Sequence, residues 1–372
     1  LILYASGPHF RQTNTIQGAI GEGTGGVTEA FKRRIVLPLA GPLELTDHVL
    51  GHELVHAFQY DITGTNVNTN TAGALALPLW FIEGMAEYLS IGPVDPHTAM
   101  WMRDAARRER LPTIDDLNNP RYFPYRYGHA LWAFIAGKYG DNAIPALLRA
   151  GAVARGYKEA FEGVLGVTTE ELSKQWHAAQ FEAYRPVAET TTLAGRIARP
   201  VIVNPSSDDG PRLNVSPELS PDGSKFMFFS ERDLFSIDLY LADTATGKVI
   251  RKITDTATDA HFETLQFIGS AGAWDPKGEL FVVPAVAKGS PVLAVFNANT
   301  GRKEREIKID GADEVLNPTW SPDGNRIAFS GIVGGLNDLF VYDLQSGSLR
   351  RLTNDPYSET DPAFSPDGNA IV

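Results

Sequence analysis

The sequence contains no cysteine and no apolar run of the roughly 18 residues that a membrane-spanning helix needs. Without cysteine the chain forms neither disulfides nor thiolate metal sites, so this composition leaves the redox compartment undetermined. The longest apolar stretch, residues 72–82, is interrupted by Pro78. We therefore expect no transmembrane segment in this chain.

Positive charge is also scarce, since 33 Lys and Arg residues face 45 Asp and Glu residues and leave a net charge of −12. An acidic chain repels the phosphate backbone, which argues against nucleic acid as a partner. The hydrophobic content of 43% is ordinary for a globular protein. The length of 372 residues allows two domains with cores of their own.

Only eight histidines are present, and two of them belong to the motif His-Glu-x-x-His at residues 52–56. In a helix of 3.6 residues per turn, His52 and His56 share one face and can bind one zinc ion, with Glu53 placed to act on water. The alternative is a helix with ordinary surface or core histidines. His48 lies one turn earlier and about 12 Å along the axis from His56, so we expect it to be a supporting or structural residue.

A third protein ligand is expected, because catalytic zinc keeps three and leaves one position for water. The otherwise apolar segment Trp80–Tyr88 carries Glu83 and Glu87 one helical turn apart. Burying a carboxylate there is costly unless a cation or a hydrogen bond compensates. Both are therefore ligand candidates, and the alternative is a pair of solvated surface carboxylates.

His-Glu-x-x-His followed by a helix with Glu-x-x-Ala-Glu resembles the gluzincin metallopeptidases, of which thermolysin is a member. The resemblance implies that Zn²⁺ is held by His52, His56 and Glu83, and that Glu53 is the general base. It also implies that Glu87, which stands where thermolysin-type enzymes have Asp, orients a zinc-bound histidine. The gap between His56 and Glu83 is longer than in the aminopeptidase branch, so membership of that branch does not follow.

In such a site zinc polarises the peptide carbonyl and lowers the pKa of its water toward 7, while Glu53 takes the proton. A further donor, commonly Tyr or His in these enzymes, stabilises the oxyanion. Tyr125, Tyr127 and His129 cluster at the start of an expected helix, and we favour Tyr127. The alternative is a tyrosine whose ring packs under the helix.

A glycine-rich stretch, residues 23–29, leads into a β-branched strand at residues 33–39. In gluzincins the strand before the active helix forms a sheet edge along which the substrate lies. The resemblance therefore implies that Gly26 and Val27 bind substrate, since an exposed edge offers unpaired backbone groups to an extended peptide. The alternative is a glycine-rich turn.

The rest of the first half has the periodicity of helices. Thr46 or Asp47 is expected to cap the helix with the histidines, and Thr168 with Glu171 fits a capping box. Further helices are expected at residues 96–109, 127–139, 141–151, 157–165 and 168–184.

A Pro-x-Gly turn recurs in the second half, and its prolines are spaced by 55, 46 and 44 residues. A period near 45 with about four strands fits propeller blades. Ser-Pro-Asp-Gly before an apolar strand, with a later Leu352-Thr353, resembles the TolB-like propellers over roughly residues 205–372. Strands are expected at residues 225–230, 239–242, 279–284, 326–330 and 339–343, and hairpin turns at 244–247 and 345–347. The turns are Ser220–Gly223, Asp275–Gly278, Ser321–Gly324 and Ser365–Gly368.

The sequence thus predicts a multidomain α+β protein. A mainly helical, zincin-type metallopeptidase domain with a small edge sheet spans residues 1–190. A linker rich in Thr, Ser, Pro and Gly spans 191–211, and an incomplete all-β propeller of three to four blades spans 212–372. The sequence begins without Met and stops inside a blade, which is expected of a fragment of a longer protein.

The predicted function is a zinc-dependent peptidase that acts on a peptide or protein substrate, with a propeller that binds or gates a protein partner. Resemblance to TolB-like propellers implies an exported bacterial protein, periplasmic or secreted. The alternative is a non-catalytic scaffold that uses the propeller for protein interaction and holds zinc only structurally.

Overall fold

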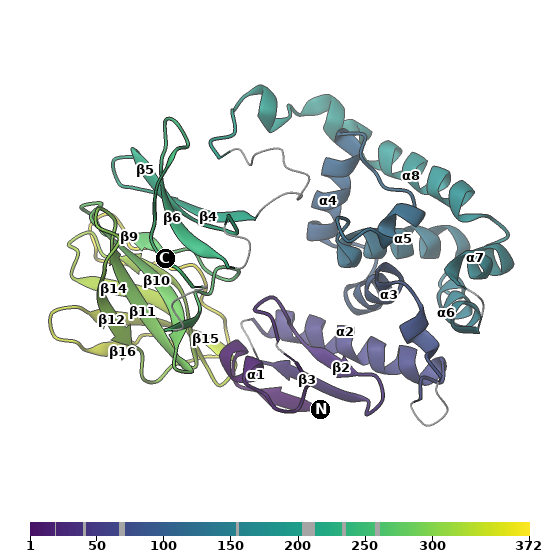
Figure 1. The fold of residues 1–372 in the computed structure, drawn as a ribbon, viewed down its shortest axis with the longest axis horizontal. Coiled ribbons are helices and arrows are strands. Elements are labelled where there is room, and N and C mark those ends of the chain that lie inside the picture. The colour runs from purple at the N-terminus through teal and green to yellow at the C-terminus, as the bar shows by residue number, and fades with distance from the viewer. Residues whose placement is uncertain are drawn as a thin grey trace. The chain divides into compact units, whose positions relative to one another are not determined.

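The computed structural model describes residues 1–18, 20–39, 42–66, 71–153, 156–202, 213–232, 236–256 and 261–372. Contacts divide the chain into a mainly helical unit and a mainly β unit, as expected for a multidomain α+β protein (Figure 1). The helical unit comprises residues 1–2, 26–37 and 47–198, and the β unit comprises 3–25, 38–46 and 199–372. Of the predicted linker, residues 203–211 lie outside the described residues.

Two early segments, residues 3–25 and 38–46, were expected in the first domain but group with the β unit. The first of these segments contains the short helix α1 (Gly7–Arg11), whose contacts explain why it groups with the β unit. The backbone N–H of Gly7 donates to Glu314 Oε2 at 3.2 Å, and Glu314 Oε1 accepts from Gln266 Nε2 at 2.8 Å. The buried Glu314 carboxylate therefore holds α1 on the β unit.

Among its described residues, seven α-helices account for most of the helical unit, and a small sheet with strand order β1-β3-β2 precedes them. The sheet strands are β1 (Ile2–Tyr4), β2 (Val27–Glu29) and β3 (Arg34–Pro38), so that β2 lies at an edge. The helices are α2 (Leu43–Ile62), α3 (Leu79–Ile91), α4 (Pro96–Arg107), α5 (Pro124–Tyr139), α6 (Ala143–Val153), α7 (Tyr157–Leu165) and α8 (Thr169–Thr190).

Three helix starts differ from the sequence prediction. α5 begins at Pro124 and α6 at Ala143, against the predicted residues 127 and 141. α2 begins at Leu43, so the predicted caps Thr46 and Asp47 lie inside the helix, and that prediction was wrong. At α8 the prediction is confirmed, because the Thr168 hydroxyl accepts a hydrogen bond from the Glu171 N–H at 3.2 Å. No described helix is long and apolar enough to cross a membrane.

Helices α3 and α5 cross at two glycines. A Cβ on Gly84 would lie 2.3 Å from the Gly128 carbonyl carbon, and a Cβ on Gly128 would lie 2.2 Å from the Trp80 oxygen. This close approach brings the carboxylates of α3 and the first turn of α5 together. Large buried side chains complete the core around the crossing, among them Trp80, Phe81, Leu131, Trp132, Ile135, Phe161, Leu172 and Trp176.

Three antiparallel sheets, with successive strands paired, form most of the described β unit (Figure 1). The predicted strands are confirmed with small shifts of their ends. The first sheet holds β4 (Asn214–Leu219), β5 (Lys225–Ser230), β6 (Asp238–Asp243) and β7 (Val249–Lys252). The second holds β8 (Phe262–Thr264), β9 (Ala273–Trp274), β10 (Leu280–Ala287), β11 (Ser290–Asn297) and β12 (Lys303–Lys308). The third holds β13 (Glu314–Trp320), β14 (Arg326–Val333), β15 (Leu336–Asp343) and β16 (Leu349–Arg351).

The four Pro-x-Gly turns have a common geometry. The last residues of these turns, Gly223, Gly278, Gly324 and Gly368, all have φ between 68° and 74°, which favours glycine. In three of them the Asp side chain accepts a hydrogen bond from the Ser two residues earlier. The turn of the second sheet has Asp275 in the Ser position, and its carboxylate accepts from the N–H groups of Glu279 and Leu280.

The helix crossing generates a stability prediction. Gly128→Ala should lower the free energy of unfolding of the helical unit by about 1–3 kcal/mol or more, because the new methyl group overlaps the α3 backbone. The matched control is Gly137→Ala on the same helix, where nothing lies within 4 Å of the new Cβ. That control should stabilise by about 0.5–1 kcal/mol. Thermal unfolding followed by the helical circular dichroism signal measures both, and equal effects would contradict the close crossing.

Candidate metal centre

The histidines of α2 and one carboxylate of α3 converge on a single point. His52 Nε2 and His56 Nε2 lie 3.1 Å apart. Glu83 Oε2 lies 3.0 Å from the first and 3.2 Å from the second. His52 and His56 are buried, and the Glu83 side chain is 14% exposed. The structure thus brings together the three residues that the sequence predicted as metal ligands.

These three atoms fit the donor set of a zinc ion. A tetrahedral ion with ligands at about 2.0–2.1 Å separates its donors by about 3.3 Å, close to the distances here. Two nitrogens and one oxygen also form a common ligand set of catalytic zinc. The cluster is acidic, because Glu53, Glu83 and Glu87 surround the two imidazoles, and a dication would offset that charge.

The histidines and glutamates of the cluster stabilise one another's charged forms. Burial alone would raise the pKa of Glu83, but hydrogen bonds and charges from His52 and His56 outweigh it and lower the pKa to about 2. Burial would likewise lower the pKa of His52, whereas its contacts with Glu83 and Glu87 raise it to about 9. The cluster therefore favours ionised carboxylates at neutral pH.

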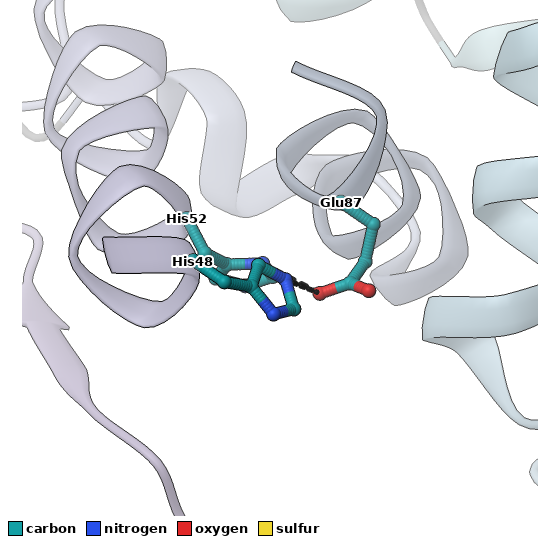
Figure 2. Close-up of side chains that lie close together, drawn as sticks. All are labelled: His48, His52 and Glu87. Atoms are coloured by element: carbon teal, nitrogen blue, oxygen red, sulfur yellow. Dashed lines mark hydrogen bonds and ion pairs between the residues drawn. The ribbon is translucent and has the colours of Figure 1, made fainter. Parts of the chain in front are cut away.

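Glu87 lies on the other side of His52, as predicted for a residue that orients a zinc-bound histidine (Figure 2). Glu87 Oε1 is 2.9 Å from His52 Nδ1, and Arg126 Nη1 donates to Glu87 Oε2 at 2.9 Å. Burial opposes ionisation of this carboxyl, but contacts with His48 and His52 hold its pKa well below the usual range. Arg126, on α5, was not identified from the sequence.

Gln59, which was not identified as a site residue from the sequence, orients His56. His56 Nδ1 lies 2.8 Å from Gln59 Oε1, and Gln59 Nε2 donates to the Ile82 carbonyl at 3.0 Å. Gln59 is buried and lies one turn after His56, so the helical spacing alone was the available signal. An oxygen acceptor on Nδ1 leaves Nε2 free to bind a metal.

Glu53 faces strand β2. The Thr28 hydroxyl lies 2.6 Å from Glu53 Oε2 and 2.9 Å from the Glu53 backbone oxygen. A Cβ on Gly26 would lie 2.8 Å from Glu53 Cγ, so a larger residue there would displace the Glu53 side chain. Burial raises the pKa of the Glu53 carboxyl, the direction expected for a group that takes and returns a proton near neutral pH. Gly26 thus lies beside Glu53, and Val27 begins the edge strand β2.

Tyr125, and not the favoured Tyr127, borders the cluster. The Tyr125 ring stacks on His52 with centroids 5.7 Å apart, and its hydroxyl hydrogen-bonds with Glu83. Tyr127 is buried in the core against Trp101 and Tyr122. Residues two apart on a helix point about 200° apart, so the two tyrosines face opposite sides, and the Tyr127 prediction is corrected.

His129, the third candidate donor, is held in the core. Its Nδ1 lies 2.8 Å from the Thr98 hydroxyl and its Nε2 lies 2.7 Å from the Gly92 carbonyl oxygen. With both ring nitrogens occupied, His129 joins α5 to the region around α4 and is structural.

Comparison with known proteins identifies part of the β unit. The family model of the TolB beta propeller domain matches residues 266–372. This match supports a TolB-like propeller domain over residues 266–372. TolB of the Tol-Pal system from Anaeromyxobacter dehalogenans is 33% identical over 93 residues, which cover 25% of this chain and 20% of that protein.

Two further proteins illustrate the similarity. The uncharacterized peptidase YuxL of Bacillus subtilis is 27% identical over 164 residues, which cover 44% of this chain and 22% of that protein. Crystalline TolB from Acinetobacter baumannii is 25% identical with a TM-score of 0.36, over 43% of this chain and 37% of that one. The chain thus spans about a fifth of the length of the curated relatives YuxL and TolB.

Proposed function

We propose that this protein is a zinc-dependent peptidase that hydrolyses peptide bonds in a peptide or protein substrate. The observation that carries the proposal is the convergence of His52, His56 and Glu83. A buried carboxylate, Glu53, lies on the same helix as the two histidines. The similarity to YuxL, an uncharacterized peptidase, is consistent with the proposal. The gluzincin-like arrangement of the helical unit belongs to this proposal.

The ligand number supports a catalytic rather than a structural metal. Structural zinc sites usually have four protein ligands, whereas catalytic sites have three and an open position. Among the described residues, the group that includes His56 has three donors. The scaffold alternative, with zinc only structural, is therefore disfavoured.

The residues of the cluster have separate roles in the proposed reaction. His52, His56 and Glu83 would hold Zn²⁺, which when bound supplies positive charge that polarises the scissile carbonyl and acidifies water. Glu53 takes the proton from the attacking water and passes it to the leaving amine. Thr28 orients the Glu53 carboxylate through the 2.6 Å hydrogen bond.

Tyr125 is the proposed donor to the oxyanion. Burial and the nearby Glu83 raise the pKa of its hydroxyl, so the hydroxyl keeps its proton at neutral pH and can donate it in a hydrogen bond. The stacking on His52 fixes the ring beside the reacting groups. A donor held in place in advance costs little reorganisation when negative charge develops on the carbonyl oxygen.

Strand β2 is the proposed substrate edge. Gly26 and Val27 lie at one end of the β1-β3-β2 sheet, and Gly26 contacts Glu53. An extended peptide paired with this edge would bring its scissile bond beside Glu53 and the proposed metal position without strong sequence preference. The TolB-like propeller is proposed to bind or gate a protein partner, and the protein is proposed to be periplasmic or secreted.

The central test of the reaction is Glu53→Gln. The variant should bind zinc as the parent does, because Glu53 is not a proposed ligand, and its kcat should fall about 10²–10⁴-fold because the proton acceptor is lost. Cleavage of a mixed peptide library, followed by mass spectrometry with and without a zinc chelator, measures this. Chelation should abolish parental cleavage. Undiminished cleavage by Glu53→Gln would contradict the mechanism.

A pair of tyrosine variants tests the oxyanion assignment. Tyr125→Phe should lower kcat about 10²–10³-fold with little change in KM, because its hydroxyl acts chiefly in the transition state. The matched control Tyr127→Phe removes a hydroxyl two residues away in the core and should leave kcat within about twofold. Steady-state kinetics on a peptide found in the library distinguish them. The assignment fails if Tyr127→Phe is the damaged variant.

A further inference from the structure

A second group of donors lies one helical turn before the proposed zinc ligands. His48 and His52 of α2 and Glu87 of α3 each place one ligand atom within 4.8 Å of the others (Figure 2). His48 Nε2 donates to Glu87 Oε1 at 3.1 Å. His48 has no role in the proposed mechanism. The position of its ring beside the buried Glu87 carboxylate therefore needs an explanation.

A second metal ion is a poor explanation of this group. With the proposed zinc on His52 Nε2, the Nδ1 atom of that ring carries the proton and cannot bind another ion. The guanidinium of Arg126 lies 2.9 Å from Glu87 Oε2, and it would repel a cation bound to the same carboxylate. Glu87 thus already has a cationic partner.

Hydrogen bonding accounts for the group better. Arg126 fixes Glu87 Oε2 and also contacts Asp95 Oδ2 at 3.2 Å, and Asp95 caps α4 by accepting from the Thr98 N–H at 2.6 Å. The other oxygen, Oε1, lies 2.9 Å from His52 Nδ1, but that contact is too bent to be a full hydrogen bond. His48 therefore supplies the better aligned donor to Oε1.

We infer that His48 is a positioning residue for the zinc site: it holds the Glu87 carboxylate where that carboxylate orients His52. This inference rests on the proposed zinc site and names a residue outside the proposed ligand set. His48 and His52 are one turn apart, so both rings reach the same oxygen of Glu87. Residues that orient ligands in this way are worth about 10–100-fold in metal affinity.

The test compares zinc affinity among three variants of the full chain. His48→Leu removes the donor and keeps an apolar side chain of moderate size, so the zinc dissociation constant should rise about 10–100-fold. His48→Gln keeps an N–H near the position of Nε2 and should restore most of the affinity. His97→Leu makes the same replacement at an exposed site on α4 and should change nothing. Chelator competition measures the affinities, and thermal unfolding of the zinc-free proteins checks that each variant folds.

The outcomes separate the inference from the proposed function. One zinc per parent chain, weakened by His48→Leu and recovered by His48→Gln, supports the inference. Equal affinity of His48→Leu and the parent overturns it and leaves the zinc site intact. Two zinc ions per parent chain, with His48→Leu losing one, would also overturn it, because His48 would then be a ligand. A parent that binds no zinc refutes the proposed function itself.

Discussion

Burial of acidic side chains against imidazoles, between α2 and α3, is the constraint on which the helical unit depends. Carboxylates are expensive to bury, yet Glu53 and Glu87 are only 6% and 4% exposed. Thr28 donates a hydrogen bond to Glu53, and His48 and Arg126 donate hydrogen bonds to Glu87. The close crossing at the two glycines of α3 and α5 brings Arg126 within reach of Glu87.

Three sets of contacts surround the two histidines of this cluster. The Nε2 atoms of the two histidines face Glu83, while their Nδ1 atoms face oxygen acceptors, Glu87 on one side and Gln59 on the other. Each imidazole therefore has an oxygen acceptor near Nδ1 and presents Nε2 to Glu83, the arrangement in which proteins prepare histidines as metal ligands. The edge strand β2 borders the remaining side and places a backbone next to Glu53.

The sequence was most informative where function depends on helical spacing. The spacing of four residues places His52 and His56 on one helix face and Glu83 and Glu87 on another, and repetition identifies the blade turns. The sequence predictions failed where tertiary contacts determine which side chain faces the site. Nothing in the local sequence distinguishes Tyr125 from Tyr127, because the choice depends on which face of α5 meets α3.

The most direct test of this account is the position of the metal in crystals of the protein grown with zinc. An anomalous difference map at the zinc edge should show a peak about 2.0–2.2 Å from His52 Nε2, His56 Nε2 and the Glu83 carboxylate. A peak coordinated by other residues, or zinc bound in solution with no peak between α2 and α3, would contradict the account.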